Sequence, residues 1–443
     1  MVTVTVPPVL RHRDFNLYWF GVVFSQVGTR GTVAANLYQV YRLTHSVPIT
    51  GFVGLAQAVA LLVLSPFGGA YADRLDRRRL LQGAQGAAFV VAALLSLATL
   101  AGTVSTWQVL VSVVLTTAAA TFDQPARQAL IPSMVPRAEL PQAFALLNPS
   151  RELAVLIGPA LAGVFIAVQG PGLMYAFDAA TYLVLIVVLG VMRTPRLVPE
   201  DAHSSVWANI RRGTSFVRGR PLILLMISLD LSATLFGAYR VVLPALALDV
   251  LHAGPTGYGL LSAAPSAGAL LATYVVFRVV GRSRRLGWVL LVSTIGYGLG
   301  TIVLAQGRVL ALALLGGVLL GGFDAMATTI RQAAVQLETP DSLRGRVSSL
   351  YQMASRGGPA LGDLNIGWVA GLLGPIGALT VGGLVPIVYA GALLARPGRI
   401  RNYTGVEPTP DVEPQAAVAP VIVPPGEWEI DAGGASGESS AFG

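Results

Sequence analysis

Residues 68–79 read GGAYADRLDRRR and place six charges within the seven residues from Asp73 to Arg79. This stretch interrupts an apolar run that begins near Ile49 and resumes at Leu80. Of the 443 residues, 54% are hydrophobic and 12% are charged, and the mean hydropathy is +0.66. Soluble domains carry about 25% charged residues, so this chain has too little polar surface for a water-soluble particle. The charged stretch therefore predicts a loop between two helices of an all-α, multi-pass membrane protein.

Apolar blocks elsewhere in the chain are long enough to cross a hydrocarbon core of about 30 Å at about 1.5 Å per helical residue. They predict twelve transmembrane helices, with the expected ranges 15–41, 49–72, 79–101, 106–126, 141–168, 173–192, 221–248, 256–280, 286–306, 309–331, 347–373 and 375–395.

Two motifs occur twice, about 200 residues apart. FDQPARQALIPSMVP at 122–136 is repeated with a small insertion as FDAMATTIRQAAVQLETP at 323–340, and GPALAG at 158–163 is repeated as GPALGD at 358–363. Both repeats fall at equivalent places among the expected helices. They predict two pseudo-symmetric six-helix bundles, an arrangement in which transporters place a site between the halves.

The distribution of arginine predicts the orientation in the membrane. With a cytoplasmic N-terminus, 24 of the 30 basic residues fall on the cytoplasmic side, two fall on the opposite side and four lie within helices. Because basic loops stay in the cytoplasm, both termini are expected there. The predicted segments are an N-terminal tail (1–14), the first bundle (15–193), a cytoplasmic linker (194–220), the second bundle (221–395) and a disordered cytoplasmic tail (396–443) rich in Pro, Gly and Ser.

The linker contains SSVWANIRRGTSFVRG, in which Val206, Ile210 and Val217 predict one apolar face of a short surface helix against anionic lipid headgroups. A merely basic linker is an equally good interpretation.

Missing residue types exclude several kinds of chemistry. The chain has no Cys, which excludes disulfides and thiolate metal sites, and no Lys, which excludes a Walker A phosphate loop. The four His residues fall at termini or in loops, so we expect neither a metal site nor a cofactor. The net charge of +8 is explained by basic loops rather than by nucleic-acid binding. Together these observations argue against an enzyme.

The charged loop resembles a signature of the major facilitator superfamily. Gly69-Ala-Tyr-Ala-Asp73-Arg74-Leu-Asp76-Arg77-Arg78 is similar to the superfamily pattern between helices two and three, with Asp76 where glycine is usual. The segments FDQPARQALIPSMVPRAEL and 229–272 are similar to the enterobactin-exporter-like branch of bacterial permeases. The resemblance covers residues 10 to 395.

The resemblance implies that this loop gates the cytoplasmic side. Gly69 would allow a neighbouring helix to pack closely, and Asp73 would accept hydrogen bonds from the start of the eleventh helix near residues 346–348. Arg77 would pair with Asp123 at the end of the fourth helix. The gating residues expected on this basis are Gly69, Asp73, Arg74, Arg77, Arg78 and Asp123. The alternative is that these arginines only set the topology.

The fifth expected helix contains Gly158, Pro159 and Gly163, similar to the Gly-Pro motif of the superfamily's antiporters. Small residues at this spacing allow close helix approach and proline bends a helix. Ordinary tight packing is the alternative interpretation.

Ionisable side chains inside the expected helices are candidates for coupling and binding, because such groups are costly in a membrane. Asp230 and Glu152 are the expected proton carriers, with Arg30 as their counter-ion or as a contact for an anionic substrate, and Asp230 and Arg30 are expected to face one another across a central cavity. Static ion pairs between helices are the alternative. The full set of candidate coupling and cavity residues is Arg30, Asp230, Glu152, Asp363, Gln26, Asn36 and Arg240.

The resemblance implies a monomeric, proton-driven exporter in a bacterial plasma membrane that moves a small amphipathic molecule, such as a siderophore, antibiotic or drug, by alternating access. Two alternatives remain at this point: an importer of the same fold, and a membrane sensor or enzyme on a permease-like scaffold.

Overall fold

The computed structural model describes residues 7–74, 76–193, 214–282, 285–396 and 398–405, and of residues 65–74, 277, 279–282, 341, 342, 344–346, 349 and 356 it describes the backbone alone. Throughout these ranges the regular structure is helical. The elements are η1 (Pro8–Arg11), α1 (Arg13–Thr44), α2 (Val47–Arg74), α3 (Arg77–Leu100), α4 (Thr106–Leu130), η2 (Ile131–Ser133), η3 (Arg137–Glu139), α5 (Leu140–Gln169), α6 (Pro171–Val191), α8 (Pro221–Leu231), η4 (Ser232–Phe236), η5 (Arg240–Val242), α9 (Leu243–Ala245), η6 (Leu246–Val250), α10 (Gly254–Arg282), α11 (Leu286–Gln306), α12 (Leu310–Leu337) and α13 (Asp341–Ala395).

The number of membrane-spanning helices agrees with the predicted twelve. Ten described helices are long and apolar enough to cross a membrane. The helix α1 is as long but less apolar than these ten, and α13 contains two spans that meet at Gly374, whose backbone is non-helical with a φ of 72°. Counting α1 and dividing α13 at Gly374 gives twelve. The predicted all-α membrane fold is confirmed.

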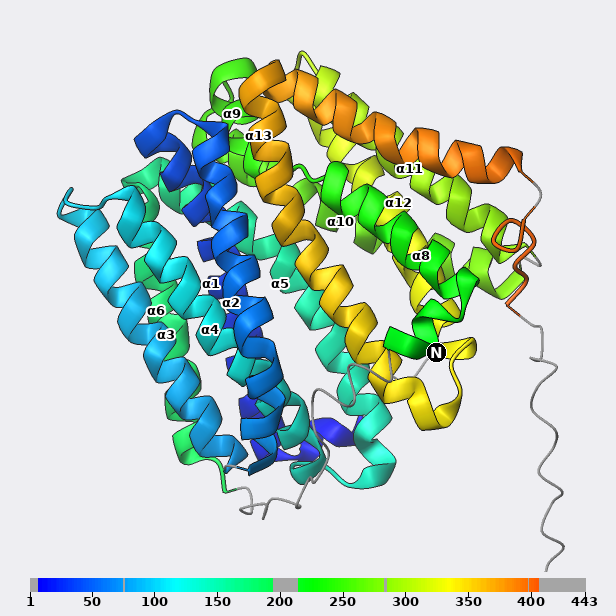
Figure 1. Cartoon of the computed structure of the whole chain (residues 1–443). Helices are drawn as coiled ribbons and strands as arrows, with labels where there is room; N and C mark the ends of the chain where they lie inside the picture. Colours follow the sequence, from blue (N-terminus) through cyan, green and yellow to red (C-terminus); the bar gives the residue numbers. More distant parts are fainter. Residues whose placement is uncertain (1–6, 75, 194–213, 283–284, 397, 406–443) are drawn as a thin grey trace, which may run out of the picture. The chain divides into compact units, whose positions relative to one another are not determined.

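Helix packing separates two groups. In the first, α1 packs against α5 and α6, and α3 packs against α4 and α6. In the second, α12 packs against α10 and α11, and α13 packs against α11 and η4 (Figure 1). Throughout this article the first group, α1–α6, is called the N half, and the second, α8–α13, the C half.

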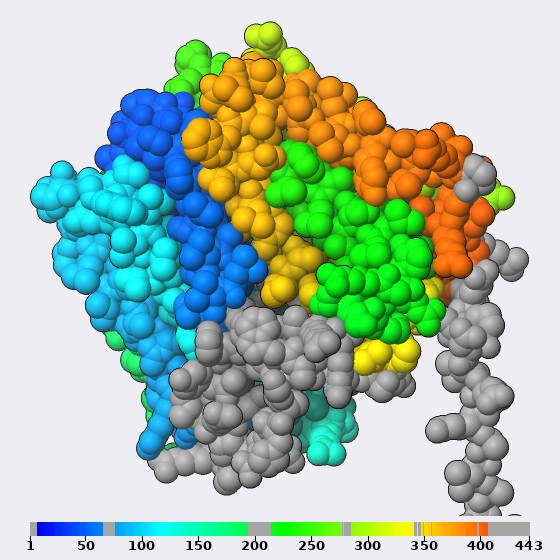
Figure 2. Space-filling view, viewed as in Figure 1, coloured from blue at the N-terminus to red at the C-terminus, as the bar shows by residue number. Residues whose placement is uncertain are grey.

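The most extensive contacts between the halves in the described part of the chain are those of α2 with α13 and of α5 with α10. Figure 2 shows the first pair side by side, with α2 in blue and α13 in gold. Glycine permits the close approach in both. A Cβ on Gly163 of α5 would lie 2.7 Å from the Cα of Gly259 on α10, and one on Gly367 of α13 would lie 3.2 Å from the Cα of Gly51 on α2.

Both glycine contacts lie toward the same end of the bundle. Gly163 is near the last residue of α5, and Gly51 is near the first residue of α2. The charged loop after Arg74 and the first residues of α3 and α5 lie at the opposite end. We call this opposite end the loop end. The end that holds the two glycine contacts is called the glycine end.

Two hydrogen bonds also join the halves toward the glycine end. The hydroxyl of Tyr41, near the last residue of α1, donates to the carboxylate of Asp249 in η6. The hydroxyl of Tyr258 on α10 donates to the carbonyl oxygen of Ala34 on α1 at 2.7 Å. The halves are therefore joined at the glycine end by both packing and hydrogen bonds.

Two predicted boundaries are wrong. The helix α13 begins at Asp341 rather than at residue 347, so the N–H groups of residues 346–348 lie inside a helix and not at its free start. The tail predicted from residue 396 begins too early, because residues 398–405 contact α11. In this segment Ile400 is buried, and the N–H of Gly287 donates to the carbonyl oxygen of Tyr403 at 2.9 Å.

The predicted linker helix is described only in part. Residues 214–218 are helical, and Val217 is buried in a cluster with Ile223, Val335 and Tyr351. Val206 and Ile210 lie outside the described residues. The described end of the linker thus packs on the C half.

Candidate functional site

A cavity of about 280 Å³ lies among α1, α3, α4, α5 and α6, toward the loop end of the N half. Its wall mixes charged, amide and aromatic side chains. The lining residues that carry a polar group are Tyr18, Gln26, Thr29, Arg30, Gln85, Thr116, Asp123, Gln124, Arg127, Gln128, Asn148, Arg151 and Tyr182. Such a wall suits a molecule that presents both hydrogen-bonding groups and apolar surface.

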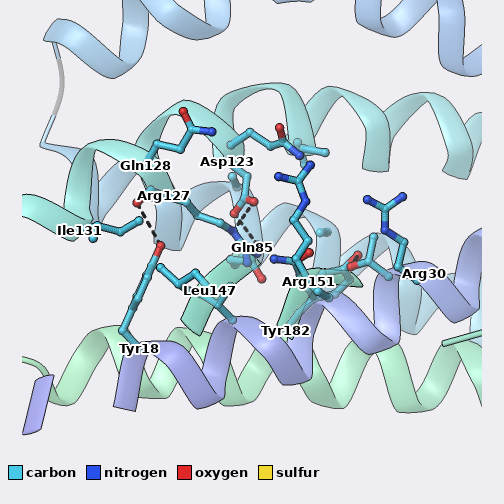
Figure 3. A pocket seen from close by; sticks show the side chains of 18 of the residues that line it. Tyr18, Arg30, Gln85, Asp123, Arg127, Gln128, Ile131, Leu147, Arg151 and Tyr182 are labelled. Atoms are coloured by element: carbon cyan, nitrogen blue, oxygen red, sulfur yellow. Dashed lines mark hydrogen bonds and ion pairs between the residues drawn. The ribbon is translucent and has the colours of Figure 1, made fainter. Parts of the chain in front are cut away.

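The best-connected group in this wall is Asp123 of α4. Arg127, one turn further along the same helix, places its Nε 2.5 Å from Oδ2 of Asp123. Gln85 of α3 donates to Oδ1 at 2.7 Å, and Tyr18 of α1 donates to the carbonyl oxygen of Arg127 at 3.1 Å (Figure 3). Four residues separate Asp123 from Arg127, so the two side chains share one helix face and pair directly.

Two further guanidinium groups line the cavity. Arg30 comes from α1 and Arg151 from α5, and Figure 3 shows both side chains extending in the same direction. With Arg127 they supply three positive charges against the single carboxylate of Asp123. The cavity wall is therefore net positive and favours an anionic group on a bound molecule.

The predicted gate residues have partners within the N half. Arg77 donates to the carbonyl oxygen of Ala129 at 3.1 Å, while Asp123 pairs with Arg127, so the expected Arg77–Asp123 pair is wrong in this structure. Arg78 donates at 2.8 Å to the carbonyl oxygens of both Met192 and Gly190. Of Gly69, Asp73 and Arg74 the structure describes the backbone alone.

The unusual Asp76 of the charged loop has a structural explanation. It is the N-cap of α3, where its side chain accepts hydrogen bonds from the N–H groups of Arg78 at 3.0 Å and Arg79 at 3.3 Å. A helix start has free N–H groups, and an aspartate satisfies them better than the glycine usual at this position.

Asp230 does not face Arg30 across a cavity, as the sequence predicted. It is buried in the C half, where its Oδ1 lies 2.7 Å from a guanidinium nitrogen of Arg331 on α12. Its Oδ2 accepts a hydrogen bond from Ser355 on α13 at 2.7 Å. Arg331 is 1% exposed and also approaches Asp324 at 3.8 Å. Asp230 therefore joins α8 to α12 and α13.

Asp363 and Arg240 form a second ion pair in the C half. A guanidinium nitrogen of Arg240 lies 2.5 Å from Oδ2 of Asp363, which is buried, whereas Oδ1 of Asp363 has no hydrogen-bond partner within the described part of the chain. The pair lies at the contact with the N half, because a Cβ on Gly54 of α2 would be 2.5 Å from the Cβ of Asp363.

The remaining candidates are spread over different environments. Glu152 is exposed and is not part of the cavity wall, whereas Gln26 is. Asn36 is buried, and no described residue forms a hydrogen bond with its Oδ1. The structure thus brings Arg30, Gln26 and Asp123 to one site and places Asp230, Asp363, Arg240, Glu152 and Asn36 elsewhere.

The Gly-Pro motif of α5 lies in helix contacts. A Cβ on Gly158 would be 2.8 Å from the backbone N of Gly31, so α5 crosses α1 there. Pro159 is buried, and its carbonyl oxygen would lie 2.9 Å from a Cβ on Gly259. Together with the contact of Gly163, the motif packs α5 on both halves.

Sequence reasoning missed Arg331, Gln85 and Asp178. Arg127 and Arg331 both lie within helices and pair with carboxylates. The repeated segments 122–128 and 323–332 could have indicated this pairing. Each contains an FD pair and an RQ pair, which place an aspartate and an arginine on one face of a helix. Asp178 is a single acidic residue in the apolar sequence of α6. An acidic residue in such a segment is costly in a membrane and is therefore a functional candidate.

The family comparison covers nearly the whole chain. Residues 4–417 match the family model of transmembrane secretion effectors. The enterobactin exporter EntS of Citrobacter koseri is 27% identical over 377 residues, which cover 85% of this chain and 90% of that protein. The enterobactin exporter EntS of Salmonella typhimurium is 26% identical over 374 residues, covering 84% of this chain and 89% of that protein.

Solved transporters share the fold at low sequence identity. The nucleoside transporter NupG matches with a TM-score of 0.68 and 14% identity, over 86% of this chain and 98% of that one. A D-xylose–proton symporter matches with a TM-score of 0.67 and 13% identity, over 88% of this chain and 98% of that one. The predicted resemblance to the major facilitator superfamily is confirmed. The chain is a multi-pass inner-membrane protein whose named relatives are transporters rather than enzymes. The chain belongs to the transmembrane secretion effector family of the major facilitator superfamily, and it is a secondary transporter of the exporting type.

Proposed function

We propose that this protein exports an anionic, amphipathic small molecule of the siderophore type, driven by protons, and that the molecule binds in the cavity of the N half. The observation that carries the proposal is the composition of the cavity wall. Arg30, Arg127 and Arg151 line the cavity together with a single carboxylate, that of Asp123, and the aromatic rings of Tyr18 and Phe144 line the same space. An acidic molecule with aromatic or apolar groups matches both properties.

Contacts between the halves support a role in alternating access. The described cross-half hydrogen bonds of Tyr41 and Tyr258 lie toward the glycine end, whereas Arg77 and Arg78 at the loop end bond within the N half. This arrangement corresponds to a state closed at the glycine end. The excess of arginine at the loop end favours a cytoplasmic location for that end and for both termini. Substrate would then enter the cavity from inside the cell, and the loop that contains Asp73 and Arg74 would act as the gate.

The test is uptake of enterobactin into inside-out vesicles that contain the purified full-length chain as a monomer, with and without a pH gradient. Inside-out vesicles present the cytoplasmic face outward, so export appears as uptake. Replacing the cavity cation in Arg30→Gln should lower uptake by about tenfold or more, because a buried contact with a charged group contributes about 1.5–3 kcal/mol. Arg137→Gln removes an exposed arginine outside the cavity wall and serves as the matched control.

Uptake that is independent of the pH gradient would contradict proton coupling. Transport in right-side-out vesicles only would identify an importer of the same fold. A normal rate in Arg30→Gln would place the substrate outside this cavity.

A further inference from the structure

One buried carboxyl group has no ion-pair partner among the described residues. Asp178 lies on α6 and is 0% exposed. Among the described residues its Oδ2 has no hydrogen-bond partner, and its Oδ1 is 3.5 Å from the Thr181 hydroxyl, a distance at which a hydrogen bond is weak. By contrast, Asp123, Asp230 and Asp363 each lie within 2.7 Å of an arginine nitrogen.

The backbone of α1 covers this carboxyl group. A Cβ on Gly28 would lie 2.6 Å from Oδ1 of Asp178 and 2.5 Å from Oγ1 of Thr181, so only glycine allows α1 to approach this closely. One turn further along α1, the Thr32 hydroxyl lies beside the same carboxyl group and is also buried without an ordinary hydrogen bond. The site therefore combines two polar groups that are buried and poorly satisfied.

Hydroxyl groups connect this site with the cavity. Tyr182 is one turn along α6 from Asp178, its hydroxyl lies beside the carboxyl group, and it is 3.0 Å from the hydroxyl of Thr29 on α1. Tyr182 and Thr29 both line the cavity. A proton that leaves the carboxyl group can thus pass along hydroxyls, each of which accepts one proton and releases one, to water in the cavity.

The electrostatic surroundings favour the neutral acid in this state. An ionised carboxylate that is buried without a cation is destabilised by the loss of its hydration. The charged groups that reach the shared cavity wall from the helices around α6 are Arg30 of α1, Asp123 and Arg127 of α4, and Arg151 of α5, while α3 contributes the neutral Gln85. Asp123 and Arg127 already neutralise one another. An anionic substrate beside Arg30 and Arg151 would reduce their positive field and so favour retention of the proton.

We propose that Asp178 is a proton-binding site of this transporter, connected to the cavity through Tyr182 and Thr29. Its role in coupling rests on the proposed function, whereas proton binding itself does not. A movement of α1 relative to α6 uncovers the carboxyl group, and the proton then leaves.

Infrared difference spectroscopy of the full chain in lipid tests proton binding directly. At neutral pH the wild type should show the C=O stretching band of a protonated carboxyl group, and Asp178→Asn should lose that band. The control Glu338→Gln, which removes a half-exposed carboxyl at the end of α12, should keep it. An identical band in wild type and Asp178→Asn would overturn the proposal.

A second variant, Tyr182→Phe, tests the proposal even if Asp178→Asn does not fold. Tyr182→Phe keeps the ring and removes only the hydroxyl. It should retain the carboxyl band and exchange that proton for deuterium more slowly than wild type. Exchange at the wild-type rate would overturn the proposed route through Tyr182.

Vesicle transport of enterobactin tests coupling. Asp178→Asn should still exchange enterobactin across the membrane but should lose accumulation driven by a pH gradient, and Asp178→Glu should restore accumulation with an altered pH profile. Full accumulation by Asp178→Asn would overturn the coupling role. Failure of the wild type to move enterobactin would instead count against the proposed function and would leave the infrared result standing.

Discussion

The two halves use the same sequence motif to build different ion pairs. In the N half, Asp123 and Arg127 pair with each other at 2.5 Å and line the cavity. In the C half, Asp324 and Arg331 are 3.8 Å apart, and Arg331 is closer to Asp230 of another helix, at 2.7 Å. One arginine therefore lines a cavity, whereas the other holds three helices together.

The insertion in the second repeat explains this difference. Four residues separate Asp123 from Arg127, a rise of about 6 Å, whereas seven residues separate Asp324 from Arg331, a rise of about 10.5 Å. Both spacings keep the two side chains on one helix face, but only the shorter one allows close pairing within the helix. The longer spacing leaves the guanidinium of Arg331 free to reach Asp230, and Thr328 accepts a further hydrogen bond from it at 2.9 Å.

The largest expected effect is on stability in the C half. Arg331→Met leaves Asp230 buried without its cation, so the free energy of unfolding should fall by about 3–5 kcal/mol. Chemical unfolding of the purified protein measures this change. The double variant Asp230→Asn, Arg331→Met should recover most of the loss, and a double variant as unstable as the single one would contradict the role of the pair.

The corresponding change in the N half should affect transport more than stability. Arg127→Gln removes the cation of a pair that lines the cavity, where water can solvate Asp123. We expect enterobactin uptake to fall by about tenfold and the free energy of unfolding to fall by only about 1–2 kcal/mol. Uptake kinetics and unfolding measured on the same preparation separate the two effects, with Arg137→Gln as the control. A loss of stability as large as that of Arg331→Met would remove the contrast between the halves.

The smallest expected effect concerns the neutral partner of Asp123. Gln85→Met keeps the length of the side chain and removes the 2.7 Å hydrogen bond to Oδ1. The loss should be about 1 kcal/mol, or about fivefold in substrate affinity. Equilibrium binding of enterobactin measures it. An unchanged affinity would show that the Arg127 pair alone holds Asp123 in place.

Sequence patterns predicted the architecture well because it follows from hydropathy and length. The twelve spans and the two repeats were visible in blocks of apolar residues and in the FD and GPAL motifs. Ion-pair partners were harder to predict. Asp230 pairs with an arginine that is about 100 residues away, and the depth of Arg331 depends on where α12 ends rather than on the local sequence. The expected pairing of Asp123 with Arg77 failed because a nearer arginine on the same helix competes.

The Gly163–Gly259 contact sets unequal lever arms for motion between the halves. At 1.5 Å per residue it lies about 9 Å from the end of α5 at Gln169 and about 35 Å from the start at Leu140. A tilt of about 10° about this fulcrum displaces the start of α5 by about 6 Å and its other end by about 1.5 Å. Most of the displacement therefore occurs at the loop end, and a small rotation at a pair of glycines would be enough to widen or narrow that end.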